Sequence, residues 1–173
     1  YAYMLEHSRA QAALVSGALL PTLTAAMMRC DHEVQTVIVS QPIAPIHPPE
    51  IEFERLIAVD SPADKPAATA PDDPAFWLYS SGSTGRPKGT VHSHANPYWT
   101  AEYYGKGVLG LTDQDICFSA AKLFFAYGLG NALSFPLSVG ATVVLMAERP
   151  TPEAVFKRWT GATGPLAGLR PTV

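Results

Sequence analysis

Short apolar runs alternate with helix-like segments along most of the chain, and this alternation constrains the fold more than any other feature. The runs 36–39 and 141–146 are rich in β-branched residues and carry no charge, which is typical of buried parallel strands. We therefore predict an α/β fold with a mainly parallel, doubly wound sheet and helices on both faces. The expected strands are 12–15, 36–39, 75–79, 116–119 and 141–146. The expected helices are 1–9, 19–28, 129–137 and 152–159, the last with Thr151 as N-cap and Pro152 as its first residue. One more helix is expected to start with Asn96 as N-cap and Pro97 as its first residue, and to carry Tyr98, Trp99, Tyr103 and Tyr104.

Residues 41–75 interrupt this alternation. They hold eight of the sixteen prolines, with acidic residues between them, so we expect a Pro-rich surface connection with room for a short helix at 50–56. The chain has 173 residues, of which 47% are hydrophobic and 16% charged, and this composition suits one soluble domain or a piece of one. It lacks an initiator methionine and stops where a strand would begin, so we expect a fragment of a longer protein.

Charge and cysteine content argue against several classes of function. The net charge is −3 with no local cluster of lysine or arginine, so we expect neither nucleic acid nor an anionic membrane as a partner. Cys30 and Cys117 are too few for a disulfide framework, and no signal peptide is evident, which favours a cytoplasmic protein with reduced thiols. Residues 123–147 carry no charge over a length that could span a bilayer, but glycines and Pro136 interrupt them. A buried helix, turn and strand is the interpretation we favour for that stretch.

The segment from Tyr79 to Gly89, Tyr-Ser-Ser-Gly-Ser-Thr-Gly-Arg-Pro-Lys-Gly, points most directly to chemistry. Its glycines can turn backbone N–H groups toward an anion, its hydroxyls add donors, and its lysine adds a positive charge. The segment is not the P-loop of the common nucleotide triphosphatases, because Pro87 stands where that pattern needs its second glycine. We therefore predict a polyphosphate-binding loop that follows a strand. Its candidate binding residues are Ser80, Ser81, Gly82, Ser83, Thr84, Gly85 and Lys88.

Other side chains give weaker signals. His92 and His94 could offer two imidazoles to a metal, but no cysteine or carboxylate follows at ligand spacing, so we predict no metal site. No spacing supports a catalytic triad or a pair of glycosidase carboxylates. Lys122 could attract a carboxylate, although a solvated lysine at the end of a strand is the interpretation we favour.

The segment 79–89, together with Ser93-His-Ala-Asn96, closely resembles the phosphate-binding signature of the adenylate-forming, or AMP-binding, enzymes. That superfamily includes acyl- and aryl-CoA ligases, adenylation domains of peptide synthetases, and luciferases. Within it, the stretch 120–131, Ala-Ala-Lys-Leu-Phe-Phe-Ala-Tyr-Gly-Leu-Gly-Asn, is most similar to benzoate-CoA ligases. The resemblance implies that residues 1–173 are an internal part of the large N-terminal AMP-binding domain, with the C-terminal domain absent from this piece.

The resemblance also implies a function in aromatic acid degradation. The full-length enzyme would use ATP with Mg²⁺ to convert benzoate, or a similar small aromatic carboxylate, to an acyl-adenylate, and coenzyme A would then displace AMP. The loop would hold the β- and γ-phosphates of ATP, while Ala126, Tyr127 and Gly128 would line the aryl-carboxylate site. Many relatives carry a histidine in this second segment, whereas this chain has none after His94, so a role for that histidine does not carry over.

No catalytic residue of the family falls within 1–173, so the resemblance implies that this piece is inactive by itself. Two alternatives stay open: an adenylation domain that loads a carrier protein, and a noncatalytic nucleotide-binding fragment. A homodimer of the full-length enzyme is open as well.

Overall fold

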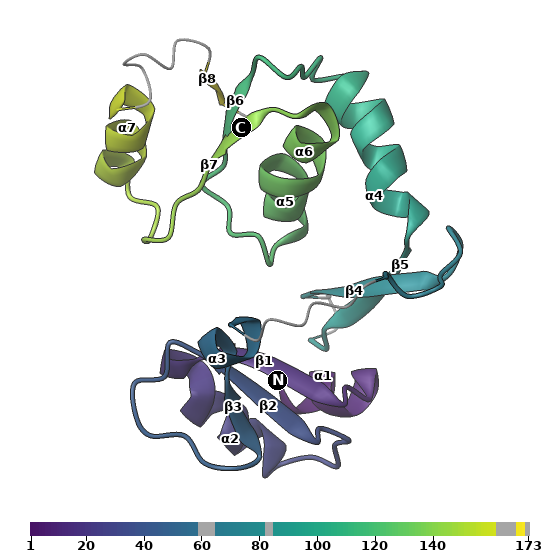
Figure 1. Cartoon of the computed structure of the whole chain (residues 1–173), viewed down its shortest axis with the longest axis vertical. Coiled ribbons are helices and arrows are strands. Elements are labelled where there is room, and N and C mark those ends of the chain that lie inside the picture. The colour runs from purple at the N-terminus through teal and green to yellow at the C-terminus, as the bar shows by residue number, and fades with distance from the viewer. Residues whose placement is uncertain (59–64, 82–84, 162–168, 172–173) are drawn as a thin grey trace. The chain divides into compact units, whose positions relative to one another are not determined.

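The computed structural model of the chain describes residues 1–58, 65–81, 85–161 and 169–171. These residues fall into two compact units, Tyr1–Ala67 and Ala68–Val173. Each unit combines helices with a parallel sheet (Figure 1), so the predicted α/β class is confirmed.

The first unit is built on a parallel sheet of three strands in the order β1-β2-β3. Val37 and Val39 of the central strand are 4% and 0% exposed, because alternate residues of a strand point to the same face and β2 pairs on both sides. The helices and strands predicted between residues 1 and 39 are confirmed. The elements are α1 (Ala2–Ser8), β1 (Ala12–Ser16), the 3-10 helix η1 (Gly17–Leu19), α2 (Leu20–Met27), β2 (Thr36–Ser40), β3 (Glu50–Glu52) and α3 (Phe53–Ile57).

The sheet of this unit includes a strand that the sequence pattern did not predict. Where the sequence left room for a short helix over 50–56, β3 pairs with β2 in parallel register, and α3 begins only after it. The carboxylate of Glu54 in α3 accepts hydrogen bonds from Ser40 Oγ and from the Gln41 N–H, both at 3.1 Å. A three-residue strand forms because its neighbour supplies the hydrogen bonds, and a local pattern cannot reveal such a partner.

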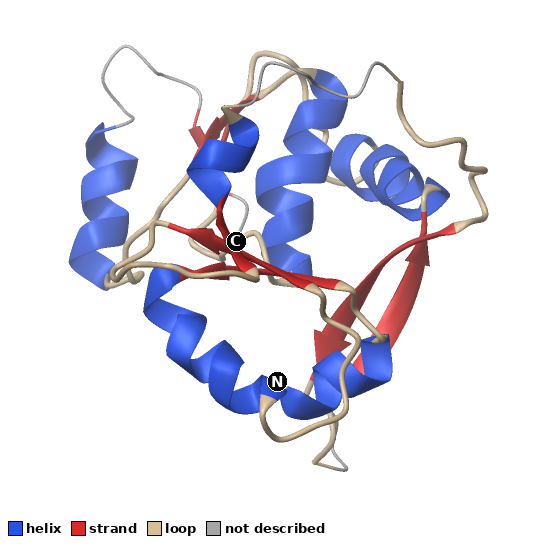
Figure 2. Ribbon diagram, turned by 60° about the horizontal axis from the view of Figure 1, so that its bottom comes forward, coloured by secondary structure: helices blue, strands red, loops and turns tan. Residues whose placement is uncertain are grey.

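The second unit contains the segments that carry the candidate site. It has an antiparallel pair, β4-β5, and a parallel sheet in the order β7-β6-β8. Figure 2 draws the strands of the chain in red and the helices in blue. The elements are β4 (Pro74–Ser80), β5 (Lys88–Ser93), α4 (Ala95–Thr100), the π-helix η2 (Ala101–Lys106), β6 (Ile116–Phe118), α5 (Ala126–Leu129), the π-helix η3 (Gly130–Ser134), α6 (Phe135–Val139), β7 (Thr142–Val144), α7 (Pro152–Gly161) and β8 (Leu169–Pro171).

The core of the second unit surrounds its central strand. All three residues of β6 are buried, and the Cys117 thiol is fully enclosed between Leu111 and Ala141. Cys117 therefore serves as a small apolar core residue. The uncharged stretch 123–147 folds as α5, η3, α6 and β7, which confirms the helix, turn and strand. The predicted burial of the whole stretch is wrong, because Phe124, Leu137 and Leu145 are 73%, 63% and 53% exposed. Across the part of the chain that the structure describes, none of the helices is both long enough and apolar enough to cross a membrane.

The start of α7 agrees with the sequence prediction, whereas the start of α4 does not. The Ala154 N–H donates to Thr151 Oγ1 at 3.3 Å, which confirms Thr151 as the cap of α7. The prediction of Asn96 as N-cap is wrong, because α4 already begins at Ala95 with His94 in the cap position. Backbone bonds from His94 N–H to Asp73 O at 3.1 Å and from Ala95 N–H to Pro71 O at 2.9 Å determine where this helix starts. Those acceptors lie more than twenty residues earlier, outside any local capping pattern.

Candidate phosphate and carboxylate site

The candidate phosphate loop connects the two strands of an antiparallel hairpin. Ser80 lies opposite Lys88 at the end of the ladder, so residues 81–87 form the connection between them. β5 was not expected, because Lys-Gly-Thr-Val-His-Ser has a single strongly apolar residue, and its strand conformation comes from pairing with β4. A Cβ on Gly89 would lie 3.2 Å from the ring of Tyr79, the residue opposite, so glycine leaves room for that ring.

Four of the predicted phosphate-binding residues lie at this end of the hairpin. Ser80, Ser81, Gly85 and Lys88 are all exposed. Gly85 has φ of +80° and no atom within 4 Å of where a Cβ would stand, so the backbone there uses the freedom that glycine gives. The predicted ligands Gly82, Ser83 and Thr84 lie outside the described residues. Exposed hydroxyls next to an exposed ammonium suit a solvent-accessible anion such as a nucleotide polyphosphate.

The candidate aryl-carboxylate segment forms the first turn of α5. Tyr127 is 49% exposed, whereas Gly128 is buried. A Cβ on Gly128 would lie 2.1 Å from the carbonyl oxygen of Lys122 and 2.9 Å from that of Ala121. No Cβ can stand so close to backbone atoms, so glycine at 128 lets the helix pack directly on the preceding turn.

A largely apolar cavity of about 580 Å³ opens between the β4-β5 hairpin and the helices that follow it. Its size is within the range of small-molecule sites. Phe76 and His92 stack across the two strands with ring centroids 5.0 Å apart. Ala126 lines the cavity, whereas Tyr127 and Gly128 belong to the same helical turn but lie outside the lining. The lining residues are Phe76, Trp77, Leu78, His92, Asn96, Pro97, Thr100, Leu123, Ala126, Leu129, Gly130, Leu133, Ser134 and Phe135.

Of the two histidines that could have suggested a metal, His92 makes side-chain contacts within the fold and His94 lies at the start of a helix. His92 stacks on Phe76, and its Nδ1 lies 3.2 Å from Asn96 Nδ2, while Ser93 Oγ donates to Asn96 Oδ1 at 3.2 Å. Asn96 thus joins the end of β5 to the first turn of α4, and His94 occupies the cap position of that helix. In the ranges covered by the structure, no three side chains among His, Cys, Asp and Glu come together as a metal site.

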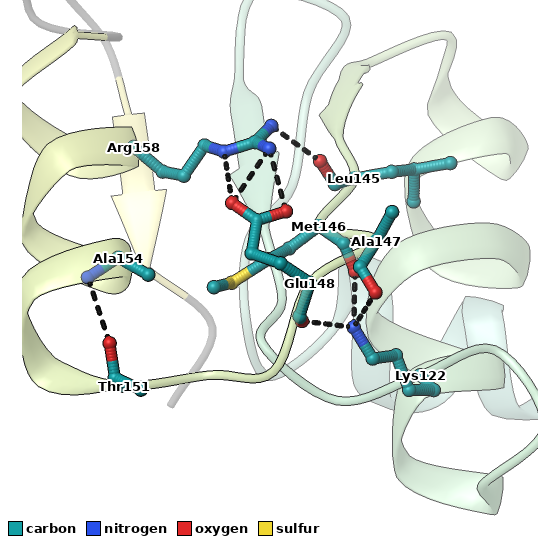
Figure 3. Close-up of polar contacts among 8 residues, drawn as sticks. All are labelled: Lys122, Leu145, Met146, Ala147, Glu148, Thr151, Ala154 and Arg158. Carbon is teal, nitrogen blue, oxygen red and sulfur yellow. Dashed lines mark hydrogen bonds and ion pairs between the residues drawn. The ribbon is translucent and has the colours of Figure 1, made fainter.

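Lys122 corrects a prediction made from the sequence. The side chain is half-buried, and its Nζ donates to the carbonyls of Met146 at 2.5 Å, Ala147 at 2.9 Å and Glu148 at 2.6 Å (Figure 3). Lys122 therefore anchors its own turn to the main chain of residues 146–148 and is not a solvated lysine. No sequence pattern indicates this role, because the acceptors are main-chain atoms 24 to 26 residues away.

Arg158 of α7 completes this polar network. Its Nε and Nη2 donate to the Glu148 carboxylate at 3.1 and 2.8 Å, and its Nη1 donates to the Leu145 carbonyl at 3.1 Å (Figure 3). Hydrogen bonding from the backbone N–H of Glu148, and then from Arg158, lowers the pKa of the Glu148 carboxyl below its ordinary value. The segment after β7 is thus bonded to α7 on one side and to Lys122 on the other.

The family follows from comparison with known proteins. The chain belongs to the AMP-binding enzymes, since the model of that family, "AMP-binding enzyme", matches residues 1–164. Among curated relatives, the chain is 53% identical over 158 residues to the benzoate-CoA ligase of Thauera aromatica, with 91% of this chain and 29% of that protein covered. It is 44% identical over 156 residues to the 4-hydroxybenzoate-CoA/benzoate-CoA ligase of Rhodopseudomonas palustris, with 90% and 28% covered.

Solved structures give the same picture. A benzoate-CoA ligase from Burkholderia xenovorans LB400 is similar with a TM-score of 0.77 and 57% identity, over 91% of this chain and 29% of that one. The anthranilate-CoA ligase AuaEII, solved in complex with anthranoyl-AMP, is similar with a TM-score of 0.82 and 30% identity, over 91% and 30%. The chain therefore spans under a third of the length of these relatives.

Proposed function

We propose that the full-length protein containing this chain is an ATP-dependent aryl-CoA ligase that acts on benzoate or a close relative. The observation that carries the proposal is the presence, in one compact unit, of a loop with phosphate-binding composition and an apolar cavity lined by the same two strands. The strong similarity to benzoate-CoA ligases over nine-tenths of the chain supports the aromatic substrate.

The proposed reaction has two steps. The carboxylate oxygen attacks the α-phosphorus of MgATP, which gives the acyl-adenylate and pyrophosphate, and the thiol of coenzyme A then attacks the acyl carbon and releases AMP. A carboxylate needs this activation because it is a poor electrophile. The loop would contribute to the first step by holding the β- and γ-phosphates through Ser81, Ser83, Thr84 and Lys88, so that positioning and charge neutralisation lower the barrier.

The remaining features of the proposal rest on the family and on the composition. Residues 1–173 are an internal part of the large N-terminal domain, with no catalytic residue of their own and no nucleic acid or membrane as partner. Ala126, Tyr127 and Gly128 line the aryl-carboxylate site, and the enzyme acts in the cytoplasm in aromatic acid degradation, with a homodimer as the proposed assembly. Mg²⁺ enters as the complex with ATP.

The test is to supply the full-length protein with benzoate and MgATP, with and without coenzyme A. We expect benzoate-dependent pyrophosphate release in both cases and benzoyl-CoA only with coenzyme A, measured by coupled assay and chromatography. Pyrophosphate release without thioester would favour a carrier protein as acceptor. The absence of any benzoate-dependent turnover would overturn the proposal.

Tyr127 gives a test of the aryl-carboxylate site. We expect Tyr127→Ala in the full-length protein to weaken benzoate binding by about 1–3 kcal/mol, the scale of one lost aromatic wall, with the ATP constant changed less than about twofold. Titration of benzoate onto the folded protein measures the change in the benzoate constant, and a melting curve of the same variant measures stability. Tyr103→Ala is the matched control, since Tyr103 is 71% exposed, stacks on Trp99 and belongs to η2 instead of the segment 126–128. An unchanged benzoate constant with a lower melting temperature would show that Tyr127 is ordinary core.

A further inference from the structure

The contacts of Lys122 leave its ammonium no hydrogen for a substrate. An ammonium group has three N–H donors, and the three carbonyls of Met146, Ala147 and Glu148 lie within 2.5–2.9 Å of Nζ. All three belong to the segment after β7, whereas Lys122 follows β6, the parallel neighbour of β7. The side chain thus joins the connection after β6 to the connection after β7. Both connections leave the carboxyl ends of their strands, and open α/β sheets bind ligands at that edge.

The backbone of the same residue supports α5. The Phe125 N–H donates to the Lys122 carbonyl at 3.1 Å, which closes the turn before the helix. Gly128 packs on that same carbonyl, at a distance that no side chain would allow. A shift of Lys122 therefore moves the first turn of α5, which carries Ala126, Tyr127 and Gly128.

A second bond network supports this anchor from the other side. Glu148 provides one of the three carbonyls, and the bidentate contact of its carboxylate with Arg158 ties that segment to α7. Arg158 thus holds the segment after β7 in place (Figure 3). The hydrogen bonds of Lys122 to this fixed segment therefore determine the position of Lys122.

We propose that Lys122 is a positioning residue for the aromatic carboxylate: it acts through the turn 122–125 and the start of α5, without touching the substrate. The inference rests on the proposed function, since it assigns to Lys122 the geometry of the aryl-carboxylate site. Misplacing a substrate-binding wall weakens binding and orientation of the substrate that it contacts, while a nucleotide held by a different loop is little affected.

The test is Lys122→Met in the full-length protein, which keeps an unbranched apolar side chain, one atom shorter, and removes the N–H donors. We expect KM for benzoate to rise about tenfold, with KM for MgATP within about twofold, because only the aryl-binding wall has moved. The matched control is Lys106→Met, since Lys106 is an exposed lysine that pairs with Glu102 on its own helix. It should leave both constants unchanged.

A conservative variant separates positioning from general stability. Lys122→Arg can still donate to the carbonyls, and we expect its KM for benzoate within about threefold of the unaltered enzyme. If Lys122→Met does not fold, Lys122→Gln, which keeps an amide donor for one carbonyl, should show an intermediate increase in the same constant. Equal changes in both substrate constants, or unchanged constants with a lower melting temperature, would overturn the proposal. Failure of the unaltered enzyme to use benzoate would instead overturn the proposed function.

Discussion

Lys88→Ala in the full-length protein is expected to slow formation of the acyl-adenylate about 100-fold, the scale of losing one group that neutralises developing charge. Transfer from preformed benzoyl-adenylate to coenzyme A should change less than about threefold, because no triphosphate is present in that step. The reason is structural: Lys88 lies opposite Ser80 where the hairpin opens into its loop, and its side chain is exposed to solvent. The joint change Ser83→Ala with Thr84→Ala should act in the same direction.

Two assays separate the steps. Pyrophosphate exchange reports the first step, and thioester formation from the preformed adenylate reports the second. Lys65→Ala is a suitable control, since Lys65 is exposed and lies outside the hairpin. If the two steps slow equally in Lys88→Ala, the loop supports the fold and does not grip phosphate.

Gly128→Ala should have the largest effect on stability. Its Cβ would meet the Lys122 carbonyl oxygen at 2.1 Å and the carbonyl carbon at 2.6 Å, and backbone atoms cannot rotate away as a side chain would. We expect a loss of about 3 kcal/mol in the free energy of unfolding, at the upper end of overpacking costs, with impaired benzoate binding in the molecules that fold.

Gly110→Ala is the comparison for this effect. Gly110 has φ of +63° and no atom within 4 Å of the place where a Cβ would stand, so its substitution costs backbone strain alone, about 1 kcal/mol. Denaturant unfolding of both variants measures the difference. Equal losses would mean that the turn before α5 moves aside freely, and the anchoring role of Lys122 would lose its support.

The sequence predicts elements where the pattern is local. The strands 36–39 and 116–119 are found within a residue of the predicted bounds, because β-branched and apolar runs report burial directly. Thr151 was found as a cap because its partner, Ala154, is three residues away. β5 was missed because its conformation depends on β4, a different segment of the chain.

The same distinction holds at the candidate site. The composition of the phosphate loop is contained in consecutive residues, so the sequence identifies it without the fold. The roles of Lys122 and Asn96 depend on bonds that the fold creates: carbonyls 24 to 26 residues away for the lysine, and the side chains at the end of β5 for the asparagine. Residue type alone did not distinguish an anchoring lysine from a solvated one.

The pairing of Ser80 with Lys88 also sets what changes of length the chain can accept here. A slip of one residue in β5 would turn Lys88 to the opposite face of the ribbon and carry Gly89 away from the Tyr79 ring. An insertion within β4 or β5 would therefore disable the hairpin. An insertion within 81–87 would leave the two strands in register. Its cost in loop-closure entropy would be small, because that entropy grows only slowly with loop length. Such an insertion would still change the spacing between the proposed phosphate-binding residues Ser81 and Lys88, so the strands should keep a fixed length to stay paired and the loop to bind phosphate.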